Sequence, residues 1–394
     1  EEGAPDEAPV VRLVNTIIAQ AVAERASDIH IEPQEDRVLV RYRVDGLLRE
    51  AMTLPRQVRA SLVARVKVLA SMDIAEKRLP QDGRFQAKYG DQEIDVRVST
   101  VPVVHGEKLA LRLLYKTGRL LTVEQLGFSP YNLRRFYEIA RATAGMVLIT
   151  GPTGSGKTTT LYALLARLNS PERHIVTIED PVEYVLRGIN QIQINVKAGL
   201  TFAAGLRSIL RQDPDIIMVG EIRDAETAQI AVRAATTGHL VLTSLHTNDA
   251  AGALTRLIDM GVEPFLVASS VVGVVSQRLV RLLCPHCREP YRPERDSPER
   301  YFMGLAPDEP VTLYRATGCR HCRQVGYRGR TGIQEVLLVT RAIRELVNGK
   351  APADAIREKA LAEGMVPLKE DGLEKVRQGI TSADEVMRVA YTEW

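Results

Sequence analysis

The stretch GPTGSGKT, Gly151–Thr158, decides the fold of this chain. It follows the apolar run MVLIT and opens a segment with helical spacing, the context in which GxxxxGK[ST] predicts a phosphate-binding loop. Its glycines let backbone N–H groups converge on phosphates, Lys157 reaches the β- and γ-phosphates, and Thr158 is the expected Mg²⁺ ligand. The predicted nucleotide contacts are Gly151, Pro152, Thr153, Gly154, Ser155, Gly156, Lys157, Thr158 and Thr159.

Strands and helices alternate on the C-terminal side of this loop. Short apolar runs bounded by polar residues predict buried strands, and the 3.6-residue spacing between them predicts crossover helices. The predicted strands are HIVTI, DIIMV and HLVLTSL, and the predicted helices are 158 onward, 202–210 and 225–235. This order predicts an α/β domain with a mainly parallel sheet, in which ligands bind at the carboxyl ends of the strands.

Two acidic segments end at that edge of the predicted sheet. In DIIMVGEIRD, Glu221 follows a buried strand, where a hydrolytic phosphate-loop protein needs a group that holds Mg²⁺ or polarises water. Gly220 stands where the usual Walker B motif has an Asp, so contact with the metal is expected through water or shared carboxylates. In TIEDPVEY, one of the carboxylates of Glu179, Asp180 and Glu183 is a further candidate for orienting or deprotonating the attacking water.

The run HLVLTSLHTND carries a histidine at each end. His246 follows the predicted strand at its C-terminal end, where it can sense a γ-phosphate. A histidine at a strand end is also a common structural hydrogen-bonding group, and that alternative stays open.

The N-terminal part has a different pattern. Residues 1–9 are acidic, rich in Pro and without periodicity, so we expect a mobile lead-in. Residues 10–115 combine an amphipathic helix over 10–22 and a second helix near 62–71 with the β-like runs RVLVRYRV, RFQAKYG, EIDVRVST and EKLALRLL. They predict a small α+β domain, joined by a linker over 116–122 to the domain at 123–394.

All four cysteines lie in two CxxC pairs, Cys284 with Cys287 and Cys319 with Cys322. Four thiolates can close a tetrahedral Zn²⁺ site with no position left for substrate, so the site is expected to be structural. It would fasten an inserted subdomain at 284–330. C-terminal helices over 336–394 follow, with helical patterns at about 341–348, 352–362 and 383–389. His286 and His321 are the alternative ligands.

Composition excludes several classes of protein. The chain has 394 residues, 45% of them hydrophobic, which predicts two or three folded domains. Its net charge is +3 and 5% of its residues are aromatic, so it lacks the basic and aromatic surplus typical of nucleic-acid binding. The apolar run 265–275 is too short for a membrane span, and the N-terminus has no signal-peptide pattern. We therefore expect a cytoplasmic protein.

Together these segments resemble a known family. GPTGSGKTTT, IEDPVEY, GEIRD and TSLHTNDA, in that order, are similar to the secretion ATPase superfamily that powers type II secretion and type IV pili. SDIHIEP, RYRVDG, LPQDGR and DVRVST resemble the domain that precedes the motor in that family. The resemblance implies a RecA-like motor domain, a PAS-like α+β domain, a tetracysteine zinc subdomain, a homo-hexamer and further domains upstream of Glu1.

The resemblance also assigns roles to two arginines. Arg97 in DVRVST and Arg112 in LALRLL match the arginine fingers that the family supplies to a neighbouring subunit. Val96 and Val98 alternate with Arg97, which predicts that its guanidinium lies on the face opposite the core. Taken alone, both would be read as exposed strand arginines, and Arg84 in QDGR is a weaker third candidate.

We therefore predict a hexameric Mg·ATP-hydrolysing motor. It would act at the inner face of the cytoplasmic membrane on an inner-membrane platform protein, assembling a type IV pilus or a type II secretion pseudopilus. ATP, Mg²⁺ and structural Zn²⁺ are the expected cofactors, and no nucleic-acid partner is expected. The alternatives are a RecA-like nucleic-acid translocase and a zinc-stabilised interaction module in which the nucleotide serves as a switch.

Overall fold

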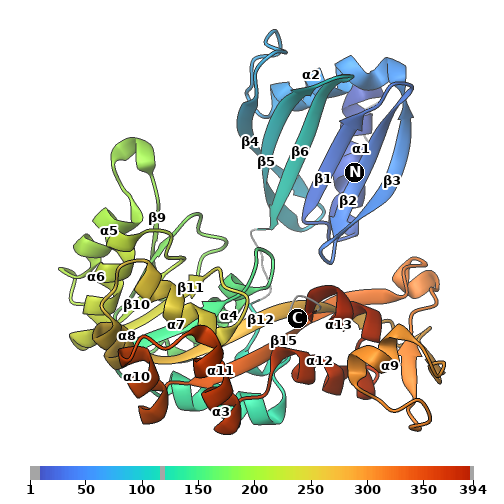
Figure 1. The fold of residues 1–394 in the computed structure, drawn as a ribbon. Coiled ribbons are helices and arrows are strands. Elements are labelled where there is room, and N and C mark those ends of the chain that lie inside the picture. The colour runs from blue at the N-terminus through green and yellow to red at the C-terminus, as the bar shows by residue number, and fades with distance from the viewer. Residues whose placement is uncertain (1–8, 116–119, 391–394) are drawn as a thin grey trace. The chain divides into compact units, whose positions relative to one another are not determined.

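The computed structural model describes residues 9–115 and 120–390 (Figure 1). Chain contacts divide it into two units, Glu1–Arg119 and Leu120–Trp394. Most of the expected lead-in and part of the expected linker lie outside the described residues.

The first unit is a six-stranded antiparallel sheet with two helices. Its strands follow the order β3-β2-β1-β6-β5-β4, and each neighbouring pair is antiparallel. The expected helices and four expected strands are confirmed, whereas β1 and β3 were not predicted. The elements are α1 (Pro9–Ala23), β1 (Asp28–Pro33), β2 (Arg37–Val44), β3 (Leu47–Pro55), α2 (Arg59–Leu69), β4 (Gln81–Tyr89), β5 (Gln92–Val103) and β6 (Gly106–Tyr115).

Both helices of this unit cover the same face of its sheet (Figure 1). The core between them comes from alternate strand positions, because successive side chains of a strand point to opposite faces. Val96 and Val98 are buried in this core, so Arg97 between them belongs to the other face, as expected. The hydroxyl of Tyr42 donates to the carbonyl of Ile17 at 2.7 Å and fastens α1 to the sheet.

The second unit contains a seven-stranded mixed sheet in the order β15-β12-β7-β11-β10-β8-β9. All its pairings are parallel except that of β12 with β15. The predicted parallel α/β arrangement is thus confirmed, while β9, β12 and β15 were not predicted. The strands are β7 (Gly145–Thr150), β8 (Ile175–Glu179), β9 (Asn190–Gln193), β10 (Ile216–Val219), β11 (Leu240–Leu245), β12 (Val271–Leu283) and β15 (Tyr327–Leu338).

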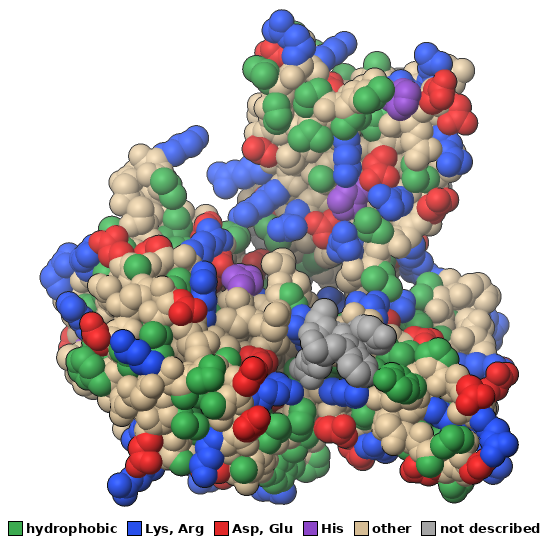
Figure 2. Space-filling view, in the orientation of Figure 1, with side chains coloured by type: hydrophobic (Ala, Val, Ile, Leu, Met, Phe, Trp, Pro, Cys, Tyr) green, Lys and Arg blue, Asp and Glu red, His purple; other side chains and the backbone are tan. Residues whose placement is uncertain are grey.

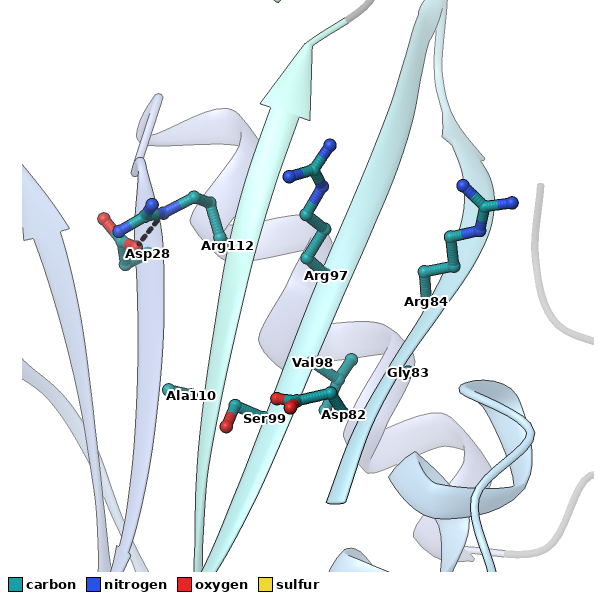
Figure 3. Close-up of a pocket in the computed structure, with 9 residues that line it drawn as sticks. All are labelled: Asp28, Asp82, Gly83, Arg84, Arg97, Val98, Ser99, Ala110 and Arg112. Carbon is teal, nitrogen blue, oxygen red and sulfur yellow. Dashed lines mark hydrogen bonds and ion pairs between the residues drawn. The ribbon is translucent and has the colours of Figure 1, made fainter. Parts of the chain in front are cut away.

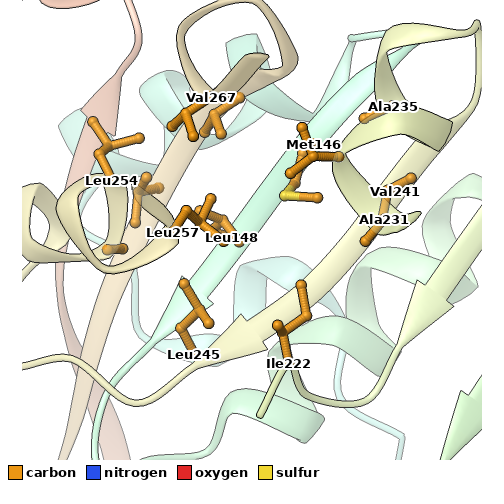
Figure 4. Close-up of a cluster of buried hydrophobic side chains, with 14 of the residues drawn as sticks. Met146, Leu148, Ile222, Ala231, Ala235, Val241, Leu245, Leu254, Leu257 and Val267 are labelled. Carbon is orange, nitrogen blue, oxygen red and sulfur yellow. The ribbon is translucent and has the colours of Figure 1, made fainter. Parts of the chain in front are cut away.

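Helices cover both faces of this sheet, which explains why its central strands are continuous apolar runs. Every residue of β7, β10 and β11 is buried. One core joins the sheet to α5, α6, α7, α8, α10 and α11, and Figure 4 shows part of it. A second core joins the sheet to α3 and α4. These helices are α3 (Pro130–Ala140), α4 (Lys157–Leu168), α5 (Phe202–Ile209), α6 (Ala225–Thr236), α7 (Ala250–Asp259), α8 (Pro264–Ser270), α10 (Arg341–Asn348) and α11 (Ala353–Ala362).

The cysteine-containing segment lies between β12 and β15, which pair with each other from Leu283 and Tyr327 onward. It contains α9 (Pro298–Met303) and the two-stranded sheet of β13 (Glu289–Tyr291) and β14 (Leu313–Arg315). A further core joins this segment to α12 (Leu368–Arg377) and α13 (Ala383–Ala390). Of the C-terminal helices, α10, α11 and α13 were predicted and α12 was not.

Charged side chains of both signs are intermixed over the face of the second unit that Figure 2 shows. Among the described helices, none combines the length and the apolar character that crossing a membrane requires.

Candidate active site and metal centre

The phosphate-binding loop predicted from Gly151–Thr158 runs from the end of β7 into α4. Gly151 and Gly156 have backbone φ angles of 148° and 85°, which residues other than glycine rarely adopt. A Cβ atom on Gly151 would lie 2.4 Å from the backbone oxygen of Gln277, and one on Gly156 would lie 2.8 Å from Nε2 of Gln277. The glycines therefore allow both the loop conformation and its close approach to β12.

Lys157 begins α4, with its side chain folded back over the loop. Its Nζ donates to the carbonyl oxygens of Gly151 and Pro152, each at 2.9 Å. Burial lowers the pKa of Lys157, attraction to Glu221 opposes this shift, and repulsion from Arg278 adds to it. Lys157 and Glu221 thus interact electrostatically although 64 positions of sequence numbering separate them.

The loop fits a phosphate group by two further observations. The hydroxyl oxygen of Ser155 is buried and has no hydrogen-bond partner among the described residues. Buried polar groups are normally satisfied, so an unpaired hydroxyl inside a glycine-rich loop matches a loop built around a polar ligand. Thr158 lies exposed in the first turn of α4, where its hydroxyl can reach a cation bound beside the phosphates.

Glu221 and His246 are placed by two similar connections. Glu221 follows β10, and the connection ends at Asp224, whose carboxylate caps α6 by accepting from the N–H of Thr227 at 2.8 Å. His246 follows β11, and its connection ends at Asp249, which caps α7 in the same way at 2.7 Å. Because β10 and β11 are parallel neighbours, both side chains lie at the carboxyl edge of the sheet.

Glu221 makes direct contacts with basic groups. Its Oε2 lies 3.2 Å from Nε2 of His246, and its Oε1 accepts a hydrogen bond from the guanidinium of Arg223. Arg223 also lies 3.6 Å from Oδ2 of Asp180. Burial raises the pKa of Glu221, but the hydrogen bonds from Arg223 and His246 outweigh it and leave the pKa below its ordinary value. The carboxylate is therefore ionised at neutral pH.

The two glutamates of the IEDPVEY segment have different surroundings. Glu179 ends β8 and is 2% exposed. One of its oxygens accepts from the hydroxyl of Tyr162, and the other accepts from Thr177 at 2.6 Å and from Gln191 at 3.1 Å. Glu183 is exposed, and its backbone N–H donates to the Tyr162 hydroxyl at 3.3 Å. Tyr162 on α4 thus connects this segment to the helix that starts at the phosphate loop.

The arginines predicted as fingers lie in the first unit, on one row across its sheet. Arg97 on β5 is paired with Arg84 on β4 and with Arg112 on β6, and Arg112 is paired with Asp28 on β1. They line an open hollow of about 580 Å³, drawn in Figure 3. Arg112 bonds to Asp28 at 3.1 Å, whereas the guanidinium groups of Arg84 and Arg97 have no ionic or hydrogen-bond partner within the described parts of the chain. Three arginine side chains thus line one hollow on this face of the sheet.

The four cysteines meet at one point. Their Sγ atoms all lie within 4.8 Å of one another, and Cys284 to Cys319 and Cys287 to Cys322 measure 3.9 and 3.7 Å. Tetrahedral Zn²⁺ with bonds of about 2.3 Å requires sulfur atoms roughly 3.8 Å apart, far beyond the bonded distance of a disulfide. The N–H groups of Cys319 and Gly326 both donate to Sγ of Cys322 at 3.1 Å, as suits a thiolate ligand. The donor set therefore fits zinc.

The histidines weighed as alternative ligands are not part of this cluster. The rings of His286 and His321 stack with centroids 4.1 Å apart. Among the described residues, the cluster able to hold a metal ion consists of the four cysteines.

Sequence reasoning missed some residues of the site. Arg223 stands inside the GEIRD motif, so its position beside Glu221 carried a local signal. No local signal pointed to Tyr162, which reaches the site from α4. The same holds for Gln277 and Arg278, which lie on β12, a strand that was not predicted.

Comparison with known proteins decides the family. A family profile described as type II/IV secretion system protein matches residues 3–388. The chain belongs to this family. It is 54% identical over 384 residues to the type II secretion system ATPase E of Vibrio cholerae serotype O1, covering 98% of this chain and 76% of that protein. It is 53% identical over 388 residues to type II secretion system protein E of Pseudomonas aeruginosa, covering 98% and 77%.

Solved structures of other proteins share the fold. The X-ray structure of the Legionella pneumophila ATPase DotB matches with a TM-score of 0.70 at 22% identity, over 99% of this chain and 98% of that one. The pilus retraction motor PilT with bound ADP matches with a TM-score of 0.62 at 25% identity, over 95% of each chain. Both matches cover at least 95% of this chain, so the similarity in fold includes both of its units.

Proposed function

We propose that this chain is the motor ATPase of a type II secretion system. It hydrolyses Mg·ATP as a homo-hexamer and delivers the resulting movement to an inner-membrane platform protein at the cytoplasmic face, where a pseudopilus is assembled. The observation that carries the proposal is that Lys157, Glu221 and His246 follow three neighbouring parallel strands, β7, β10 and β11, at one edge of the sheet, where Glu221 contacts His246. Relatives above 50% identity named for type II secretion favour that system over pilus assembly.

ATP would be held through its phosphates by the loop Gly151–Thr159. The backbone N–H groups and the hydroxyl of Ser155 bind phosphate oxygens, and the charge of Lys157 compensates theirs. Mg²⁺, when bound with ATP, neutralises phosphate charge, and Thr158 supplies its hydroxyl as a ligand.

Glu221 orients and polarises the attacking water. Its depressed pKa keeps it ionised as a hydrogen-bond acceptor, and Arg223 and His246 fix its direction. We assign Glu179 to positioning the segment that follows β8, because both its oxygens accept hydrogen bonds from protein groups. The exposed Glu183 is the second candidate for the water-orienting group.

We further propose that Arg97 and Arg112 act on nucleotide bound by a neighbouring subunit. Both arginines line the open hollow on the sheet face opposite the core, which supports this role. A guanidinium there can stabilise charge that develops on a γ-phosphate. The zinc site stabilises residues 284–330 and takes no part in the reaction, since four thiolates leave no open coordination position. The strand orders of the two sheets support classing the units as PAS-like and RecA-like.

One experiment tests the proposal as a whole. Molar mass by light scattering and the ATP turnover rate are measured together over a range of protein concentrations, with and without single-stranded DNA. We expect the turnover rate per subunit to rise as hexamer forms and to be unaffected by DNA. Turnover that needs DNA would replace the secretion motor by a nucleic-acid translocase, and binding of ATP without turnover at any mass would indicate a nucleotide switch.

A further inference from the structure

Gln277 is a buried polar residue on β12 that contacts the phosphate loop directly. It is 2% exposed. Its Nε2 donates to the carbonyl of Ser155 at 2.7 Å, and its Oε1 accepts from the hydroxyl of Thr160 on α4 at 2.9 Å. One amide therefore holds both the loop and the helix that follows it. The close approach of Gly151 and Gly156 described above is also to this residue.

Further buried polar groups support Gln277 from behind. Gln334, its cross-strand partner on β15, directs Nε2 to Oε1 of Gln277 at 3.5 Å and to the carbonyl of Leu126 at 3.0 Å. The backbone N–H of Gln334 donates to Oδ2 of Asp371 on α12 at 2.9 Å. Lys375 donates to the same oxygen at 2.7 Å. All are at most 7% exposed, so contacts between groups excluded from water connect α12 to the loop.

Core packing alone does not explain why polar groups are buried around Gln277. A well-packed apolar side chain at position 277 would satisfy the core, but it would leave the carbonyl of Ser155 unpaired. A phosphate loop needs its N–H groups directed at the ligand, so its carbonyl groups point away and need donors from the surrounding fold. Gln277 provides such a donor where the loop turns into α4.

We propose that Gln277 is a positioning residue for the phosphate loop, held in place by Gln334 and, through it, by α12. The role rests on the proposed function, because it presumes that the loop binds the phosphates of ATP. Gln277 does not touch the nucleotide itself. It sets the loop shape in which Ser155, Gly156 and Lys157 meet the phosphates, and thereby sets the affinity for nucleotide.

The test measures Mg·ADP binding by isothermal titration calorimetry on the full chain, with kcat and KM for ATP on the same preparations. We expect Gln277→Met to raise the Kd for ADP about tenfold, since an unpaired buried carbonyl commonly has an effect of that order. KM should rise by a similar factor, with kcat changed by less than about threefold. Gln277→Glu should bind ADP at least as weakly as Gln277→Met, because a carboxylate repels the carbonyl oxygen of Ser155.

Thr243→Val is the matched control. Thr243 lies on β11 in the same sheet and is fully buried. Its hydroxyl has no hydrogen-bond partner among the described residues, so loss of this hydroxyl should leave ADP affinity unchanged. Thermal unfolding without nucleotide reports whether each variant is folded. If Gln277→Met does not fold, Gln334→Met decides, with an expected rise in Kd of about fivefold from the lost support.

Wild-type affinity for ADP in folded Gln277→Met, or in Gln334→Met where that variant decides, overturns the proposal. Failure of the proposed function looks different. Wild-type protein that binds ADP but hydrolyses no ATP would refute the motor assignment and leave the ADP titrations of Gln277 fully informative.

Discussion

Nε2 of His246 lies 3.2 Å from Oε2 of Glu221, joining the ends of two parallel strands at the carboxyl edge of the sheet. The opposite oxygen of the same carboxylate accepts from Arg223. With its direction fixed on both sides, Glu221 is preorganised to orient a water molecule, and its role can be tested separately from that of Lys157.

We predict that Glu221→Gln binds ATP but hydrolyses it at least about a hundredfold more slowly, whereas Lys157→Ala binds ATP weakly. Glutamine has nearly the same shape as glutamate, so the change removes the charge with little effect on packing. ATP binding and turnover are measured for each variant. Glu226→Gln, an exposed acid on α6 that pairs with Arg207, is the matched control and should behave as wild type. Wild-type turnover by Glu221→Gln would transfer the role to Glu183 or Glu179.

The arginine row gives a prediction about subunit cooperation. Trans arginine fingers contribute on the order of 10³ to 10⁵ in rate, so Arg97→Ala and Arg112→Ala should retain ATP binding and lose nearly all turnover. Mixing Arg97→Ala with Lys157→Ala should restore part of the activity, since some interfaces of a mixed ring combine an intact loop with an intact finger.

Arg37→Ala is the control for the arginine variants, because Arg37 lies at the start of β2 in the same sheet, outside the hollow, and bonds to Gln34. It should leave turnover unchanged. Subunit exchange is verified by mass or by energy transfer between labelled subunits. If exchange occurs and the mixture stays inactive, the arginines act within their own subunit or only structurally.

The sulfur geometry predicts one zinc ion per chain. Metal analysis of protein purified without chelators should find this ratio, and Cys319→Ser should lower it and reduce the unfolding temperature by more than about 5 °C. His321→Ala, which changes a neighbour outside the cysteine cluster, should keep the full zinc content. Zinc-free wild-type protein, or a Cys319→Ser variant of unchanged stability, would contradict the structural role.

Glu385 gives a prediction about acid stability. It is 1% exposed and fastens α13 to β12 by accepting from the N–H and the guanidinium of Arg281, both at 2.8 Å. Burial raises the pKa of Glu385, but hydrogen bonds from Arg388 and Arg281 outweigh it and lower the pKa to about 2. Between its ordinary value of 4.5 and about 2, the unfolded chain binds a proton that the folded protein does not.

This stabilisation is therefore present above pH 4.5 and is lost as the pH falls toward 2. We expect Glu385→Gln to be roughly 2 to 3 kcal/mol less stable than wild type at pH 7, with the difference shrinking as the solution becomes acidic. Urea unfolding of both proteins at pH 7, 4 and 3 measures the difference. A gap that stays constant with pH would show that the carboxylate charge is not its source.

Local sequence was sufficient wherever neighbouring residues determine the structure. The phosphate loop could be predicted because its glycines, lysine and flanking strand are contiguous, and the loop conformation depends on φ angles that glycine allows. The central strands could be predicted because helices on both faces require continuous apolar runs. The CxxC pairs indicated a four-thiolate site because the two cysteines of each pair are close in sequence.

Tertiary structure alone decided which distant groups meet. β12 carries three consecutive polar residues, Ser276, Gln277 and Arg278, between apolar residues, so its sequence matches neither a buried nor an amphipathic strand. Its antiparallel pairing with β15 spans the whole cysteine segment. Ser276 and Gln277 are compatible with burial because groups from elsewhere in the chain form hydrogen bonds with them. Such hydrogen bonds depend on neighbours in three dimensions, which sequence periodicity does not record, so the contact of Gln277 with Ser155 could not be predicted. The row of Arg84, Arg97 and Arg112 likewise depends on the register between strands, which only the folded protein shows.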